Sequence, residues 1–195
     1  MDRRWIVAGV VALLAIFAVL ALVVGGVVGR SIVPTPAEPS RPATVRFADT
    51  LTDVAISYPV TWVRRMSSDQ GVRILASSPD NSAGLSVSVR KSGLEPVTFN
   101  TLPVVRSLTD DLLKADDRIT NPGQPEAVSV GGLPGYRYAY TYRTQDRTLG
   151  AHIHYFLFKK GRLVQLVLQA VPAEKLNSLA PTFQQIANSF EGNRR

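Results

Sequence analysis

The run of residues 5–29 constrains this chain more than any other feature of its sequence. Its 25 residues contain no charged side chain, no amide side chain and no proline. As a helix rising 1.5 Å per residue it would be about 37 Å long, which exceeds the roughly 30 Å hydrocarbon core of a bilayer. It is also longer than the apolar region of about 7–15 residues in a secretory signal, and no small-residue cleavage site follows it. We therefore predict an uncleaved transmembrane helix over residues 5–29, with a cleaved signal as the alternative.

Residues 1–4 are predicted to form a short cytoplasmic tail, because Arg3, Arg4 and the terminal amine place positive charge before the helix. A long C-terminal domain crosses a membrane largely regardless of its own charge, so the domain is expected outside the cytoplasm. The inverted topology, with a cytosolic domain, is the alternative. Gly25 and Gly29 form a G-x-x-x-G pair, a spacing that allows close helix contact and would support a weak homodimer in the bilayer.

Residues 30–44 include four prolines and few large apolar residues, which predicts a semi-extended linker. Residues 45–192 are enough to bury a core and are predicted to form one globular domain. The chain has no cysteine. This excludes disulfides, zinc–thiolate sites, iron–sulfur clusters, thiol catalysis and a lipid-modified N-terminal cysteine.

Most of the domain alternates between apolar and polar residues with period two, which is typical of half-buried strands. In the first half, the apolar alternation runs through residues 54–58, 72–76 and 85–89. In the second half, strands are predicted over residues 126–130, 135–143, 148–160 and 162–171, with Lys160 and Gly161 as a tight turn between the last two.

Two helices are predicted among these strands. Thr101 is expected to cap the first, and the residues predicted on its buried face are Val104, Val105, Leu108 and Leu112. An apolar stripe over residues 176–190 predicts the second, which Pro181 is expected to kink or to divide into two abutting helices. Strands linked as hairpins, with a helix between them and a helix at the end, predict an α+β fold in which helices cover an antiparallel sheet.

Three short segments carry a family resemblance. Residues 54–62 read VAISYPVTW, residues 131–137 read GGLPGYR and residues 186–190 read IANSF. Together they resemble PsbP-like domains over roughly residues 45–190. The family includes the photosystem II accessory protein, the Mog-type Ran-binding protein and actinobacterial LpqN/LpqT-type lipoproteins. The resemblance implies an α/β/α sandwich and a binding or accessory role without shared catalytic residues.

Two further observations bear on that resemblance. Arginine outnumbers lysine by 17 to 5, as in high-GC actinobacteria. The chain lacks the lipobox cysteine of the lipoproteins, and the predicted anchor helix would take its place.

His152 and His154 are the only histidines, and their spacing on a predicted strand places them on one face. A metal site would need a third ligand, and the same strand offers neither cysteine nor carboxylate. Phe156 and Phe158 continue that face, which favours a structural role. The alternative, an enzyme using this strand, requires a carboxylate that converges on the two imidazole rings.

Tyr136, Tyr138, Tyr140 and Tyr142 share one face of a single predicted strand. Tyrosine favours strands, and such a stripe can pack beneath a helix. Each ring also offers a flat apolar face and a polar tip, so the stripe could instead hold a lipid or a glycan. Together with the two histidines, these tyrosines are the candidate ligand-binding residues.

Basic residues cluster at 64–65, 90–91, 159–160 and 162, and residues 31–195 carry 19 Lys and Arg against 14 Asp and Glu, a net charge of +5. This excess could favour anionic lipid headgroups or acidic envelope polymers, and dispersed solvated charge is the alternative. No nucleic-acid-binding motif is present, so no nucleic acid partner is expected. The sequence also contains no nucleophile elbow, zincin motif, phosphate-binding loop or dinucleotide fingerprint. The carboxylates expected as surface charge beside the first helix are Asp110, Asp111, Asp116 and Asp117.

The sequence therefore predicts a single-pass membrane protein with a short tail, a linker and one domain outside the cytoplasm. Its expected role is a non-enzymatic binding or accessory module of the cell envelope, with no catalytic residue, metal or cofactor. Its expected partner is an envelope protein, a lipid or a glycan. A carrier or sensor of a lipid or glycan on the tyrosine face is the alternative.

Overall fold

The computed structural model describes residues 43–120 and 122–192. The predicted tail, the predicted membrane helix and nearly all of the linker lie outside these residues. Within the described ranges no helix has the length and apolar character needed to cross a membrane. The elements in chain order are β1 (Thr44–Asp49), β2 (Val54–Pro59), β3 (Val63–Arg64), β4 (Val72–Ser77), β5 (Ala83–Lys91), the 3-10 turn η1 (Leu102–Val105), α2 (Arg106–Lys114), β6 (Ile119–Thr120), β7 (Glu126–Val130), β8 (Leu133–Arg143), β9 (Leu149–Lys159), β10 (Arg162–Ala170), the 3-10 turn η2 (Ala173–Lys175) and α3 (Leu176–Asn188).

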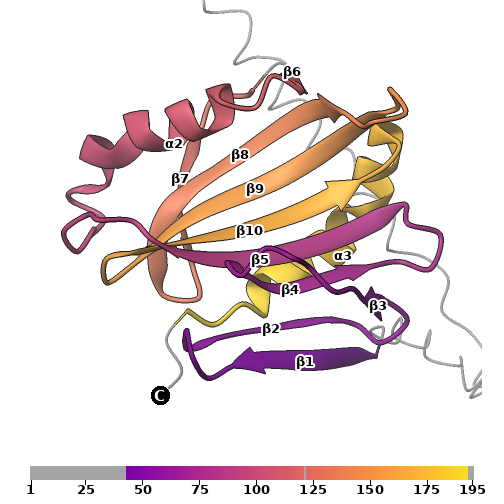
Figure 1. The fold of residues 1–195 in the computed structure, drawn as a ribbon, viewed down its shortest axis with the longest axis horizontal. Coiled ribbons are helices and arrows are strands. Elements are labelled where there is room, and N and C mark those ends of the chain that lie inside the picture. Colours follow the sequence, from indigo (N-terminus) through magenta and orange to yellow (C-terminus); the bar gives the residue numbers. More distant parts are fainter. Residues whose placement is uncertain (1–42, 121, 193–195) are drawn as a thin grey trace, which may run out of the picture. The chain divides into compact units, whose positions relative to one another are not determined.

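The strands form one large antiparallel sheet and a separate hairpin (Figure 1). The large sheet has the order β3-β4-β5-β10-β9-β8-β6, and β7 also pairs with β8. β1 and β2 form the hairpin. The antiparallel sheet with its two helices confirms the predicted α+β class. No strand is predicted over residues 44–49, whose side chains are mostly exposed.

The turn between β9 and β10 is as tight as predicted. Lys160 and Gly161 both have positive φ, at 39° and 74°. Two-residue hairpins of type I′ need positive φ at both central residues, because only this backbone twist matches the twist of the flanking strands. The turn therefore fixes the register in which Arg162 lies opposite Lys159.

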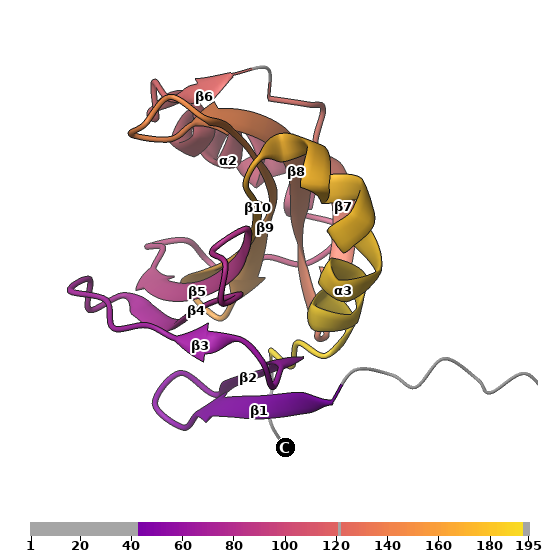
Figure 2. The same ribbon diagram turned by 90° about the vertical axis from the view of Figure 1, so that its right-hand side faces the viewer.

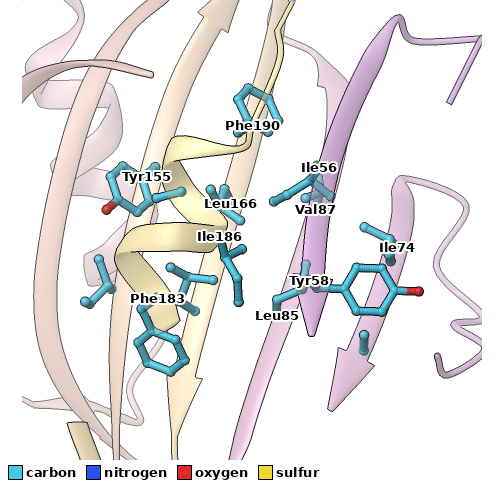
Figure 3. Packing of buried hydrophobic residues seen from close by; sticks show 14 of the residues in the cluster. Ile56, Tyr58, Ile74, Leu85, Val87, Tyr155, Leu166, Phe183, Ile186 and Phe190 are labelled. Carbon is cyan, nitrogen blue, oxygen red and sulfur yellow. The ribbon is translucent and has the colours of Figure 1, made fainter. Parts of the chain in front are cut away.

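The core on the α3 side of the sheet follows the predicted apolar stripe. Phe183, Ile186 and Phe190 are buried and lie among sheet residues such as Leu166 and, from β2, Ile56 (Figure 3). α3 is one helix that runs through Pro181, so the expectation of two abutting helices is wrong. The proline removes a single backbone donor, and the packing of the residues after it holds the helix together.

The other face of the sheet carries η1 and α2 (Figure 2), and here the predicted buried face was wrong. Val104 is 79% exposed and Leu112 is 41% exposed. Of the predicted face, Val105 is buried and Leu108 is half-buried, and the other buried residues are Leu102, Thr109 and Leu113. Thr101 makes no side-chain cap, because the helix begins with a 3-10 turn and its α-helical part starts only at Arg106. This tighter turn rotates the buried stripe by one position relative to an ideal α-helix.

Candidate functional site

The two histidines and the tyrosine stripe meet on the α2 side of the sheet. The β8–β9 register places Tyr140 opposite His152 and Tyr138 opposite His154. All these side chains point to one face, because they alternate with residues of the opposite face along each strand. The structure thus brings together the six residues that the sequence singled out.

Tyr140 joins the two imidazoles. Its hydroxyl lies 2.9 Å from Nδ1 of His154 and 3.2 Å from Nδ1 of His152. Nε2 of each histidine faces the Oε1 of a glutamine and donates to it, so both Nδ1 atoms are acceptors. A tyrosine has one hydroxyl proton, so Tyr140 donates to only one Nδ1 at a time. The remaining nitrogens also have partners, since Nε2 of His152 meets Gln169 at 3.2 Å and Nε2 of His154 meets Gln165 at 3.1 Å. Every ring nitrogen therefore lies within hydrogen-bond distance of a neutral side chain.

Burial keeps both histidines uncharged. Desolvation lowers the pKa of His152 to about 4, against a smaller opposing effect of the Gln169 hydrogen bond. Desolvation and, to a smaller extent, the neighbouring His152 together lower the pKa of His154 to about 3. Because burial disfavours the charged form of an imidazole, neither ring is protonated near neutral pH. Burial likewise raises the pKa of Tyr140.

The tyrosines differ in how deeply they are covered. Tyr136 is buried and donates to the backbone oxygen of Leu102 in η1, at 3.2 Å. Tyr138 is also buried, and its hydroxyl contacts Thr109 of α2 and donates to a carboxylate oxygen of Asp110 at 2.7 Å. Tyr142 is half-buried and stacks on His152 with ring centroids 4.0 Å apart. The stripe thus packs largely beneath η1 and α2.

Asp110 corrects one expectation about surface charge. Its side chain is half-buried and accepts from Tyr138, whereas a fully solvated position was predicted. The reason is again the rotation of the helix, which turns Asp110 toward the sheet. Neither histidine is hydrogen-bonded to a carboxylate in the part of the chain that the structure describes. No group of three or more potential metal ligands occurs among the described residues.

A cavity of about 180 Å³ adjoins the stripe at Tyr138, between α2 and the segment before β7. It is smaller than the 300–1,000 Å³ or so of typical ligand pockets. Of the four stripe tyrosines, Tyr138 alone is among its lining residues. A lipid or glycan could lie along the whole stripe only if α2 moved away from the sheet.

A larger groove lies on the opposite side of the sheet, between β7 and α3. It has a volume of about 530 Å³, and its walls come from β7 on one side and from Gln184, Ala187 and Asn188 of α3 on the other. Arg137 and Tyr155 lie between these walls. The Tyr155 hydroxyl has no hydrogen-bond partner among the described residues, whereas Arg137 forms an ion pair with Glu126 at 3.0 Å.

Sequence reasoning missed this groove. Its polar side chains come from segments about 50 residues apart, and each of them is unremarkable by itself. One signal was available, because Gly131 and Gly132 end β7 with positive φ and allow its hairpin with β8. That hairpin leaves β7 with a single neighbouring strand in the described sheet.

The comparisons with known proteins bear on the fold. No family model and no curated protein sequence matches the chain. Among solved structures, the cyanobacterial PsbP protein CyanoP from Synechocystis is similar at 17% identity and a TM-score of 0.55, over 82% of this chain and 98% of its own.

Two further structures are similar at lower identity. LpqN, described as involved in cell envelope biogenesis of Mycobacterium tuberculosis, has 12% identity and a TM-score of 0.52, over 80% of this chain and 86% of its own. The yeast Ran-binding protein Mog1p has 8% identity and a TM-score of 0.52, over 78% of this chain and 97% of its own. The domain therefore has a PsbP/Mog1-like fold.

Proposed function

We propose that this chain is a non-enzymatic binding module of the cell envelope, held at the membrane by residues 5–29. The observation that carries the proposal is the open groove between β7 and α3, which is lined largely by polar side chains. An envelope protein that presents an extended segment is the partner proposed for it.

The chemistry of the groove suits such a segment. β7 has one strand neighbour, so its other edge can pair with an added strand through main-chain hydrogen bonds. Gln184 and Asn188 on α3 are exposed amides; Nε2 of Gln184 donates to Oδ1 of Asn188 at 2.7 Å, which leaves Oε1 of Gln184 and the amide N–H groups of Asn188 for a peptide backbone. Arg137 and Glu126 add one charge of each sign at the mouth of the groove.

Two further points support a binding role over catalysis and a place in the envelope. The only histidines, of which His154 is buried and His152 half-buried, are uncharged at neutral pH and lie against neutral side chains, which is a poor arrangement for proton transfer. LpqN, which shares the fold, is described as an envelope biogenesis protein. A membrane tether would raise the local concentration of the domain at the envelope, so that weak contacts become productive.

Co-purification from cells of the native host tests this proposal. The full-length chain is crosslinked in the cells and purified, and its proteins and lipids are identified by mass spectrometry. Asn188→Arg places a cation in the groove, and Asn177→Arg makes the same change on α3 outside the lining residues. We expect a stoichiometric protein that is retained by Asn177→Arg and lost with Asn188→Arg. A bound lipid or glycan without such a protein would instead support the carrier alternative.

A further inference from the structure

A row of cations crosses three neighbouring strands at one end of the sheet. Arg162 of β10 is the register partner both of Lys91 on β5 and of Lys159 on β9. Residues that are register partners point to the same face, so the three side chains lie side by side on the α3 side. One row further into the sheet, the same positions hold the buried residues Val89, Val164 and Leu157.

The carboxylates around this row are committed to other cations. Lys159 is buried and donates to Asp53 and to the backbone oxygens of Thr52 and Asp53, so it holds the β1–β2 loop in place. Asp49 pairs with Arg73, and Asp69 pairs with Arg90. No ion pair of Lys91, Lys160 or Arg162 occurs within the described parts of the chain.

Like charges placed directly opposite each other on adjacent strands destabilise a sheet. The Lys91–Arg162 pair therefore opposes folding, and among the described residues no carboxylate forms an ion pair with either cation. Conflicts of this kind between local preference and fold are expected at functional sites. A bound anion would remove the conflict, because it would lie between the two positive charges.

The space for such an anion is present. Two adjoining cavities of about 190 Å³ and about 330 Å³ share Arg162, Thr52 and Leu51. Arg73 and Lys91 line the first, and Lys160 lines the second. Arg73 is an additional residue at the irregularity between β4 and β5, and its buried Nε lies 3.5 Å from the Asp49 carboxylate without forming a hydrogen bond to it. Leu51 is 79% exposed at the rim.

From these observations we infer that the cavities between the β1–β2 loop, β5 and the β9–β10 turn bind a phosphate group. The guanidinium of Arg162 presents paired donors that match phosphate oxygens, and the two lysines add charge without demanding a fixed geometry. Three uncompensated cations match a group that carries up to two negative charges. This site lies apart from the β7–α3 groove, and the two sets of lining residues do not overlap.

The phosphate could belong to a lipid headgroup or be free in solution, and one titration distinguishes the two. The full-length chain in neutral detergent micelles is titrated calorimetrically with inorganic phosphate in one arm. In the other arm it is titrated with micelles that contain phosphatidylglycerol, with phosphatidylcholine as the zwitterionic reference. Saturable binding of inorganic phosphate identifies a free phosphate ligand. Binding only of phosphatidylglycerol micelles identifies an anionic headgroup.

Lys91→Gln/Arg162→Gln is the test variant, and Lys114→Gln/Arg143→Gln removes the same charges elsewhere. We expect the test variant to bind at least tenfold more weakly and the control to bind like the unchanged chain. Without ligand, the test variant should keep or gain thermal stability, because a like-charge pair has been removed, and this shows that it still folds. The inference is overturned if neither probe binds, if the test variant binds as well as the unchanged chain, or if both variants weaken binding equally.

Discussion

Tyr140 lies between the two histidines in the polar network on the α2 side of the sheet. Its hydroxyl lies within hydrogen-bond distance of Nδ1 of both histidines, and Nε2 of each histidine lies against Oε1 of a glutamine of β10. A network in a low-dielectric interior is stabilising only while every member is satisfied. The sequence could predict that these residues share a face, because period two alone decides that. It could not predict the hydrogen bonds, since they depend on the register between β8, β9 and β10.

Tyr140→Phe should destabilise the protein by about 1–3 kcal/mol, because it leaves at least one buried imidazole nitrogen without a partner. Tyr155→Phe is the matched control, since Tyr155 is equally buried and its hydroxyl has no hydrogen-bond partner among the described residues. Denaturant unfolding of both variants gives the comparison. Equal losses of stability would show that the Tyr140 bridge contributes nothing.

The two histidines also make the free energy of unfolding depend on pH. Their folded pKa values, about 4 for His152 and about 3 for His154, lie below the unfolded value of 6.5. Above pH 6.5 both are neutral in either state. As the pH falls from 6.5 to 4, both histidines become protonated in the unfolded chain, whereas in the folded chain they stay largely neutral. Each therefore lowers the free energy of unfolding by about 3 kcal/mol, and the two together lower it by about 6 kcal/mol.

Unfolding free energies measured at intervals from pH 8 to pH 4 check this. His152→Gln should flatten the decrease, because it removes one of the two titrating groups. The carboxylates with lowered pKa values, such as Asp116, begin to lower stability only below about pH 5, and the difference between the unchanged chain and His152→Gln isolates the histidine. A stability that stays constant between pH 6.5 and pH 4 would contradict the burial of the histidines.

At the scale of elements, most of the longer strands were predictable, whereas β1, the short strands β3 and β6, and the placement of α2 were not. The alternation of apolar and polar residues predicts β5, β7 and β10, because one face of each strand is more buried than the other. Adjacent apolar pairs occur in η1 (Val104–Val105) and in α2 (Leu112–Leu113), so periodicity alone fits two neighbouring faces. The 3-10 turn η1 determines which of the two faces is buried, and no residue of the sequence predicts this turn. The groove escaped prediction because it exists only where α3 lies beside β7.

Leu113→Ala and Leu112→Ala test which face of α2 is buried. Leu113 is 3% exposed and Leu112 is 41% exposed. Leu113→Ala should cost about 2–5 kcal/mol, through lost burial and the cavity left behind. Leu112→Ala should change stability by no more than about 0.5 kcal/mol. Thermal or denaturant unfolding of both variants measures the difference, and a larger loss for Leu112→Ala would restore the face predicted from sequence.

At the scale of the whole molecule, a domain with a PsbP/Mog1-like fold follows a predicted membrane anchor over residues 5–29. The absence of cysteine gives a direct test of topology, since one introduced thiol is then the only one in the chain. Arg143→Cys in the full-length chain should react with a membrane-impermeant maleimide on intact cells. Asp2→Cys, in the predicted cytoplasmic tail, should react only after lysis. The reverse labelling pattern would establish the inverted topology.

The β7–α3 groove as the binding surface is the central claim, and site-specific photo-crosslinking in living cells of the native host tests it most directly. A photoreactive residue is placed at Ser129 or Gln184 in the groove, and at Asn177 or Ser107 outside it. The account predicts that both groove positions give an adduct with the same protein and that neither outside position does. Adducts of equal yield from all four positions, or from the outside positions alone, would contradict it.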